Sequence, residues 1–398
     1  MIKPAARMAE LPPYLFLELD RLAEARRQLG RDVINLGVGD PDLPTPDYIV
    51  DAMMQAVKRP ANHRYPNYLG GVSFRRSMAQ WYHHRFGVEL DPDREVVGLI
   101  GSKEGIAHLI WAMAGAGDLV LVPDPAYPVY ATQATLAGAE AVTLALDPSR
   151  GFLPDLDAVD EAVWRQAKML WLNYPNNPTG AIAPEAFLAE AVDRCRHYDV
   201  LLCHDNAYAE MTYDGYRAPS VLQIPGAKEI AVEFYSFSKP FNMTGWRVAA
   251  AVGAPVAIEA LGLLKSHLDS GVFTAVQEAA IVALDTGGGS EAGRVFERMN
   301  AIYAARRDLV VDGLSAAGLD ISRPLATFYL WFRTPGKMTS AAASKFFLEQ
   351  ADTVVTPGRA YGAHGEGWLR IALTESEERL QSAVERMAAA VKMHPVGS

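Results

Sequence analysis

The sequence predicts an α/β protein with a large domain and a smaller α+β domain. The large domain is expected to hold a mostly parallel, seven-stranded-type sheet with helices on both faces. Two observations support this. Continuous apolar runs recur through the middle of the chain, which is typical of strands covered on both faces. Helical segments such as 106–115 and 184–198 separate several of these runs, and alternating strands and helices build mostly parallel sheets.

The predicted strands of the large domain are short and follow one another at regular intervals. They occupy residues 95–100, 118–125, 168–175, 199–205, 230–238 and 247–253. The Gly-rich segment 285–293 is typical of a linker. Beyond it the pattern predicts a long helix at 292–318, strands near 326–332, 352–358 and 368–374, and a final helix at 377–391.

These elements predict a division of the chain into three parts. Residues 1–45 form an N-terminal arm and the first part of the small domain, because this segment is too short to fold alone. Residues 46–287 form the large domain, and residues 288–398 form the C-terminal small domain.

Composition excludes several classes of protein. The chain has 398 residues, with 37 Lys and Arg against 47 Asp and Glu, so its net charge is −10. Because nucleic-acid binding needs a basic face, no nucleic-acid partner is expected. The two cysteines, Cys195 and Cys203, predict buried free thiols, and no Cys/His cluster has metal-ligand spacing. No signal peptide or run of 18 apolar residues occurs, which predicts a cytoplasmic protein with no membrane partner.

Polar residues follow the predicted strands at the point where each strand ends. In an open α/β sheet, ligands bind beyond the carboxyl ends of the strands. Here those ends run into GSKEG at 101–105, PDPAYP with Tyr127, NYPNNPTG with Asn177, HDNAY with Asp205 and Tyr208, and SFSK with Lys239. The ordered set predicts a single cleft that holds a phosphate-type turn, an aromatic ring, an amide, a carboxylate and a lysine.

Lys239 and Asp205 are the residues with the clearest chemistry. A lysine in a poorly hydrated, cationic site becomes a nucleophile that forms an imine with an aldehyde; the alternative is a solvated surface lysine. A carboxylate at the end of a buried strand needs a partner, which a protonated ring nitrogen would supply. A helix cap or a salt bridge is the alternative for Asp205, and plain turn chemistry is the alternative for Asn177.

Two further places in the sequence predict anion binding. A helix that starts near Ser102 would offer free backbone N–H groups to a phosphate, and Ser236 and Arg247 could add hydrogen bonds. Arg370 lies within an apolar strand, WLRIALT, and must be paired if it is buried. A substrate carboxylate or an internal acidic side chain would each satisfy it.

The chain resembles the fold-type I pyridoxal-phosphate aminotransferases of class I/II along nearly its full length. The matching segments are NLGVGDPD, YPNYLG, GSKEG, NYPNNPTG, HDNAYAE, SFSKPFNMTGWR and GWLRIALT. Stretches such as PPYLFLEL, NHRYPNYLG and TPGRAYGAHGEGWLRIAL are most similar to the subfamily that acts on LL-diaminopimelate, in lysine biosynthesis. The resemblance implies a homodimer with shared active sites that transfers an amino group from an amino acid to a keto acid, 2-oxoglutarate, with pyridoxal 5'-phosphate as cofactor.

The resemblance also implies a role for each site residue. Those on the cofactor are Lys239 on its aldehyde, Asp205 on its ring nitrogen, Tyr127 stacked on the ring, Asn177 and Tyr208 on its phenolic oxygen, and Ser102, Lys103, Ser236 and Arg247 on its phosphate. Lys239, Asp205 and Tyr127 are thereby the expected catalytic residues. Tyr65 would reach the phosphate of the neighbouring subunit. Gly39 and Arg370 would receive the substrate α-carboxylate, Asn177 would also contact the substrate, and Tyr14 and Lys103 would meet its far end.

The sequence departs from the diaminopimelate subfamily at two positions. Some members carry a glutamate in the turn before Gly70, where this chain has Tyr68 and Leu69, and a distal asparagine of some members falls at Thr274. Other reactions of the same fold therefore remain open: aspartate, alanine or aromatic transamination, or C–S bond cleavage. A cofactor-sensing transcription regulator would need an attached basic domain, which the acidic composition does not favour.

Overall fold

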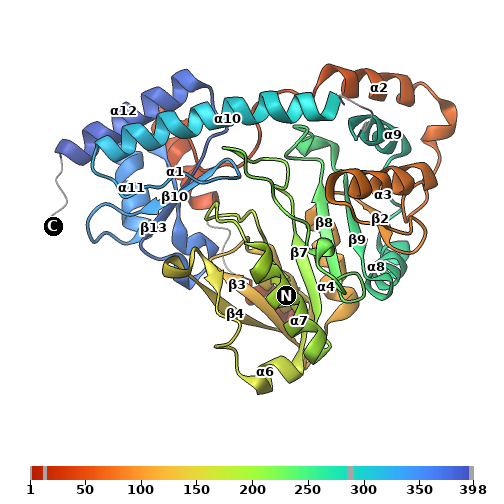
Figure 1. Cartoon of the computed structure of the whole chain (residues 1–398). Helices are drawn as coiled ribbons and strands as arrows, with labels where there is room; N and C mark the ends of the chain where they lie inside the picture. Colours follow the sequence, from red (N-terminus) through yellow and green to blue (C-terminus); the bar gives the residue numbers. More distant parts are fainter. Residues whose placement is uncertain (1, 12–15, 285–290, 394–398) are drawn as a thin grey trace.

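The computed structural model describes residues 2–11, 16–284 and 291–393 (Figure 1), so the predicted Tyr14 and residues 285–290 of the predicted linker lie outside it. A large sheet dominates the fold. Its strands, in the order in which they lie side by side, are β2 (Val96–Leu99), β9 (Ala249–Gly253), β8 (Ala231–Ser236), β7 (Leu201–Asp205), β6 (Ala167–Leu172), β3 (Leu119–Asp124), β4 (Glu140–Asp147) and β5 (Leu153–Pro154). The predicted α/β class is confirmed.

Strand direction decides which loops meet at one edge of this sheet. Strands β4, β3, β6, β7 and β8 are parallel to one another. Strand β9 is antiparallel to both β8 and β2, so β2 points the same way as the parallel set. The residues before β9 therefore lie at the same edge as the residues that follow β2, β3, β6, β7 and β8.

Helices cover both faces because neighbouring residues of a strand point to opposite sides. Val120 and Val122 of β3 belong to one apolar cluster, and Leu119 and Leu121 belong to the other. The first cluster includes α4 (Ser102–Met113), α5 (Val129–Ala137) and α8 (Pro255–Leu268). The second includes α3 (Val72–Phe86), α7 (Glu185–Tyr198) and α9 (Thr274–Ala283). Cys195 and Cys203 are buried free thiols, as predicted.

The sheet differs from the prediction at its outer end. Strand β4 was not predicted, because it alternates exposed and buried residues instead of forming a continuous apolar run. The two-residue strand β5 pairs antiparallel with β4 and brings the described sheet to eight strands rather than seven.

The C-terminal part is smaller and mixes helices with short strands. It contains α10 (Glu291–Ala316), α11 (Ser340–Ala351) and α12 (Glu377–Met393), and an antiparallel sheet of β10 (Tyr329–Arg333), β13 (Trp368–Ala372) and β12 (Thr356–Pro357). Strand β1 (Ile34–Asn35) pairs with β11 (Thr353–Val354), so the N-terminal segment packs with this part, as expected. The domain boundaries themselves stay a prediction.

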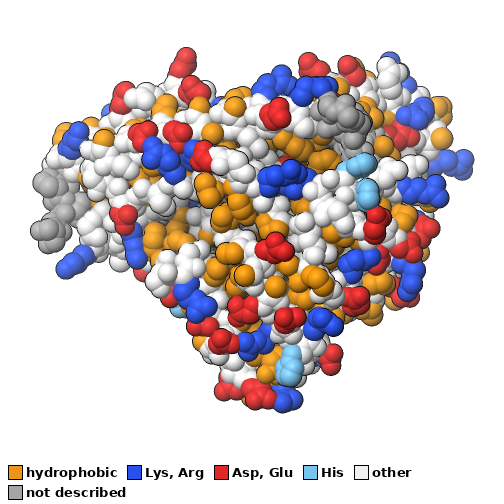
Figure 2. All heavy atoms as spheres, in the orientation of Figure 1, with side chains coloured by type: hydrophobic (Ala, Val, Ile, Leu, Met, Phe, Trp, Pro, Cys, Tyr) orange, Lys and Arg blue, Asp and Glu red, His pale blue; other side chains and the backbone are white. Residues whose placement is uncertain are grey.

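The remaining elements connect these layers. They are α1 (Phe16–Gln28), α2 (Asp47–Val57), α6 (Glu161–Gln166), and the short helices η1 (Ala6–Ala9), η2 (Pro60–His63), η3 (Pro148–Arg150), η4 (Val221–Gln223), η5 (Thr244–Trp246), η6 (Gly358–Tyr361) and η7 (Ala363–Gly365). None of the described helices has the length and apolarity of a membrane span. On the face drawn in Figure 2, acidic and basic side chains are interspersed.

Helix α8 offers a matched test of the core. Leu261 is fully buried in the apolar cluster under this helix, whereas Leu263 is 63% exposed. Leu261→Ala should lower the free energy of unfolding by about 2–5 kcal/mol, because it removes buried methyl groups and leaves a cavity. Leu263→Ala should change it by no more than about 0.5 kcal/mol. Urea unfolding of the two variants checks this, and equal effects would contradict the packing described for α8.

Candidate active site

A cavity of about 770 Å³ lies at the edge of the large sheet where the carboxyl ends of its parallel strands meet. Residues of the small sheet, Tyr329 and Arg370, complete its wall. Most of the predicted site residues line it: Gly39, Ser102, Lys103, Tyr127, Asn177, Asp205, Tyr208, Ser236, Lys239, Arg247 and Arg370. The chain thus brings together residues that are up to 331 positions apart, from Gly39 to Arg370.

Lys239 follows β8 and points into this cavity. Its Nζ donates a hydrogen bond of 2.8 Å to the carbonyl of Gly39 and lies 5.3 Å from the centre of the Phe328 ring. Burial lowers the pKa of Lys239 below its ordinary value of 10.5; Tyr329 and Asp40 act against this, and Arg370 and Arg247 add to it. The alternative of a solvated surface lysine is therefore wrong, and the amine loses its proton more readily than an exposed lysine does.

Asp205 ends β7 and is buried at the cavity wall. Its Oδ2 accepts a hydrogen bond of 2.7 Å from Tyr130, and its main-chain carbonyl accepts one of 2.7 Å from Asn173 Nδ2. No described residue bonds to its Oδ1 or forms an ion pair with it, so a salt bridge does not explain its burial. Burial raises the pKa of this carboxyl group, and an N–H donor on a ligand would stabilise its charged form.

The turn before α4 has the features of a phosphate site. Gly101 has a φ of +82°, and a Cβ at this position would lie 2.0 Å from Arg247 Nη2, so the guanidinium group lies directly over the turn. The hydroxyl of Ser102, the first residue of α4, is buried and bonds to no other described group. Arg247 Nη1 donates to the carbonyl of Thr244 at 2.8 Å. A helix N-terminus with an unpaired hydroxyl and a guanidinium group suits a dianion.

Arg370 is buried, 3% exposed, between the rings of Tyr329 and Tyr361 at 4.1 and 4.9 Å. Its Nη1 donates to Asn177 Oδ1 at 3.0 Å, and its Nη2 donates to the carbonyl of Gly37 at 2.6 Å. Neither partner carries a charge, and within the described ranges nothing bonds to its Nε. The alternative of an internal acidic partner is wrong, and the geometry leaves the guanidinium charge for a bound carboxylate.

Tyr208 and Gly39 are held by the same tyrosine of the small sheet. The hydroxyl of Tyr208 donates to that of Tyr329 at 3.2 Å. A Cβ at position 39 would lie 2.0 Å from the Tyr329 hydroxyl, so only glycine fits there. The ring of Tyr127 lies at the cavity and makes an edge contact with Tyr130, with 6.1 Å between ring centres.

One described residue of the predicted site does not line this cavity. Tyr65 is 90% exposed and lines a separate hollow with His63, Pro66 and Phe273. Its role toward a neighbouring subunit stays a prediction. Tyr14 lies outside the described residues, so its predicted role is not tested.

Three residues that bond to or contact the site residues were not predicted from the sequence: Tyr130, Asn173 and Tyr329. Tyr130 stands three positions after Tyr127, and Asn173 directly follows the strand β6. Both residues lie in segments that follow a predicted strand, as the predicted site residues do, so the same pattern could have identified them. Tyr329 lies inside an apolar strand, where nothing in the sequence separates it from the core.

Comparison with known proteins gives the class of protein that this fold and site define. The sequence matches the family Aminotransferase class I and II over residues 31–387. It is 50% identical to the LL-diaminopimelate aminotransferase of Moorella thermoacetica over 97% of this chain and 98% of that protein. It is 51% identical to the protein of the same name from Desulforudis audaxviator over 96% of each chain. The chain therefore belongs to the class I and II aminotransferases.

Solved structures agree with this assignment. BacF from Bacillus subtilis, with substrate bound, superimposes with a TM-score of 0.92 at 35% identity, and the match covers 98% of each chain. A probable N-succinyldiaminopimelate aminotransferase from Thermus thermophilus gives 0.87 at 37% identity, with 94% of this chain and 99% of that chain covered. An aspartate aminotransferase variant from Thermus thermophilus gives 0.91 at 30% identity, over 98% of this chain and all of that chain.

The protein is thus an enzyme that uses pyridoxal phosphate and acts on small amino and keto acids. The residues present fit this cofactor. The orphan Oδ1 of Asp205 suits a ring N–H, and the buried hydroxyl of Ser102 under Arg247 suits a phosphate. When bound, the cofactor supplies an aldehyde that condenses with amines and a ring that withdraws electrons from the substrate α-carbon.

Replacement of Lys239 tests the assignment of the nucleophile. Lys239→Ala should abolish turnover and the visible absorption band of the bound cofactor, because it removes the buried amine that bonds to the Gly39 carbonyl at the cavity wall. The exposed Lys168 on β6 provides the control, and Lys168→Ala should leave both unchanged. An active Lys239→Ala enzyme would refute the role.

The lowered pKa of Lys239 gives a second test. In the cofactor-free protein, acylation by acetic anhydride needs the uncharged amine, so labelling of Lys239 should rise with pH around a midpoint below its ordinary 10.5. Mass spectrometry of the labelled peptides over a pH series measures this, with Lys168 in the same sample as the reference for reagent quality. A midpoint at or above 10.5 would contradict the burial of the amine.

Proposed function

We propose that this enzyme is an LL-diaminopimelate aminotransferase that passes the amino group to 2-oxoglutarate. The observation that carries the proposal is the similarity to relatives of that name, 50% and 51% identical over 97% and 96% of this chain. The cavity supports it, because it has charged side chains beyond those that the cofactor and one carboxylate require.

In this proposal the contacts of each residue determine its role. Arg370 grips the α-carboxylate of the substrate from between its two tyrosine rings, and Asn177 holds the guanidinium group in orientation. Asp205 would accept a hydrogen bond from the ring N–H of the cofactor, and Ser102 and Arg247 would hold its phosphate. Lys239 Nζ, whose pKa is lowered by burial, takes the proton from the substrate α-carbon. Tyr127 covers the ring, and Asn177 and Tyr208 bond to its phenolic oxygen.

The far end of diaminopimelate is a second amino-acid head, which requires a cation for its carboxylate and an anion for its ammonium group. Lys103 and Arg359 line the cavity and supply the cations. Three acids among the described residues line the cavity: Asp205, Asp40 and Asp20. Asp205 serves the ring and Asp40 interacts with Lys239, which leaves Asp20 for the distal ammonium group.

Asp20 is held near the cavity by the small domain. It lies on α1, whose later turns are fixed by Arg26, which donates to Asp352 Oδ1 at 2.7 Å, and by the packing of Ala23 on Leu348 and Val354. An acid on this helix can replace the glutamate that the turn at Tyr68 and Leu69 lacks.

We further propose a cytoplasmic homodimer. Tyr65 supports the dimer, because a tyrosine that is 90% exposed beside a surface hollow is typical of a contact with another subunit. Sedimentation of the holoenzyme checks the assembly.

Single-turnover bleaching of the cofactor band tests the substrate. LL-diaminopimelate, glutamate, aspartate and alanine are mixed in parallel with the holoenzyme, without keto acid. LL-diaminopimelate and glutamate should bleach the band fastest, since they are the proposed donor and the amino form of the proposed acceptor. Faster bleaching by aspartate or alanine would contradict the proposal, and pyruvate with ammonia would indicate a lyase.

Asp20→Asn tests the distal contact. The variant should lower kcat/KM for LL-diaminopimelate about tenfold, the loss expected for one partly exposed charge-assisted hydrogen bond. Its kcat/KM for glutamate should not change, because glutamate has no distal ammonium group. Glu24→Gln, an exposed acid on the same helix, is the control. An equal loss for both substrates would remove Asp20 from specificity.

A further inference from the structure

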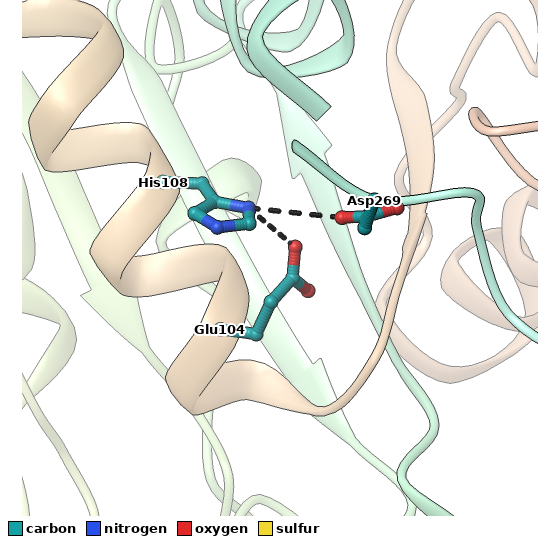
Figure 3. Close-up of side chains that lie close together, drawn as sticks. All are labelled: Glu104, His108 and Asp269. Carbon is teal, nitrogen blue, oxygen red and sulfur yellow. Dashed lines mark ion pairs between the residues drawn. The ribbon is translucent and has the colours of Figure 1, made fainter. Parts of the chain in front are cut away.

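A cluster of charged side chains lies directly behind the phosphate-type turn. Glu104 and His108 lie on α4, and Asp269 follows α8 (Figure 3). Lys265, on α8, is fully buried, and its Nζ lies 2.8 Å from Glu104 Oε1 and 2.9 Å from Asp269 Oδ2. His108 Nδ1 lies 2.6 Å from Glu104 Oε1 and 3.8 Å from Asp269 Oδ2.

The three groups of Figure 3 are close enough to hold a metal ion, since their ligand atoms lie within 4.8 Å of one another. However, the ammonium group of Lys265 is already bonded to both carboxylates. A metal ion would have to displace a buried cation that the chain itself supplies. The cluster is therefore an internal ion pair network, and its contacts with neighbouring segments indicate its role.

Glu104 connects this network to the turn. Its second oxygen, Oε2, accepts a hydrogen bond of 2.9 Å from the main-chain N–H of Ile100. Glu104 is the third residue of α4, and its carboxylate reaches back past the N-cap Gly101 to Ile100. The bond fixes Ile100 and so the left-handed Gly101, over which the Arg247 guanidinium group lies.

Without a neighbouring cation, the negative charge of Glu104 would weaken phosphate binding at the turn. A carboxylate two residues from Ser102 repels a phosphate dianion, and inside a protein such repulsion is stronger than in water. Burial acts to raise the pKa of Glu104, but hydrogen bonds from His108 and the charge of Lys265 outweigh it, and the pKa is lowered. Glu104 is therefore ionised, and the ammonium group of Lys265, which it shares with Asp269, offsets its charge.

We propose that Glu104 and Lys265 are positioning residues for the cofactor phosphate: Glu104 fixes the turn that receives it, and Lys265 neutralises Glu104 so that the turn attracts the dianion. The proposal depends on the cofactor and not on the substrate. It therefore stands or falls separately from the assignment of diaminopimelate.

Cofactor-free enzyme titrated with pyridoxal phosphate and with pyridoxal, which lacks the phosphate, tests this. Lys265→Met keeps most of the unbranched side chain and removes its charge. It should raise the Kd for pyridoxal phosphate at least about tenfold, through the uncompensated carboxylate, and change the Kd for pyridoxal less than about twofold. Adding Glu104→Gln to Lys265→Met should recover part of the affinity, because no charge is then left at position 104.

Lys168→Met is the control for the substitution itself, since Lys168 is exposed. Circular dichroism and thermal unfolding show whether each variant is folded. An equal loss of affinity for both ligands would mean that Lys265 only supports the fold, and would overturn the proposal. Unchanged binding of pyridoxal phosphate by Lys265→Met would overturn it as well, as would a double variant that binds this cofactor no better than Lys265→Met.

Discussion

The burial of one carboxylate, that of Asp205, is the constraint on which the site depends. An ionised carboxylate inside a protein loses its hydration and is costly unless hydrogen bonds or charges replace it. Tyr130 donates to Oδ2 of Asp205 and the main-chain N–H of Ala207 also stabilises the carboxylate, while Oδ1 has no hydrogen-bond partner in the described structure. A ligand with an N–H donor can bond to this oxygen, and the hydrogen bond that the protein does not supply then adds to the binding free energy of the ligand. The cost of burying the carboxylate is therefore also a source of cofactor affinity and of ring orientation.

The basic side chains are the second electrostatic constraint on the site. Lys239, Arg247 and Arg370 all line one cavity, and each charge raises the cost of the others. The protein keeps the guanidinium groups charged and lowers the pKa of the lysine, which is the only one of the three that can lose its proton easily. The same electrostatic field favours bound anions and makes the lysine amine easier to deprotonate. The antiparallel strand β9 makes this possible, because it brings Arg247 to the edge where the parallel strands end.

Much of this arrangement could be predicted from the sequence, because it depends on two local signals. Continuous apolar runs located the buried strands, and polar residues at the ends of those runs located the cavity. Strand β4 was not predicted, because its outward side chains are exposed to solvent and interrupt the apolar run. Tyr329 and the pairing of Lys265 with Glu104 escaped for a different reason: each involves a side chain in an apolar segment whose partner, Tyr208 or Glu104, is more than 100 positions away. Such pairs form only when the chain folds, and no local pattern marks them. For Arg370, the sequence could say only that a partner was required, and the structure identified uncharged ones.

The substrate is the property that the scaffold determines least. Solved relatives named for different substrates share this fold, so the strands and the cofactor contacts cannot distinguish them. What differs among such enzymes must lie on elements that reach the cavity without belonging to the sheet. In this chain α1 is such an element, since its later turns dock on α11 and β11 while Asp20 lines the cavity. A helix attached to the small domain can exchange an acid for another side chain without disturbing Asp205, Lys239 or the phosphate turn. Substrate choice can therefore change while the chemistry of the sheet edge stays the same.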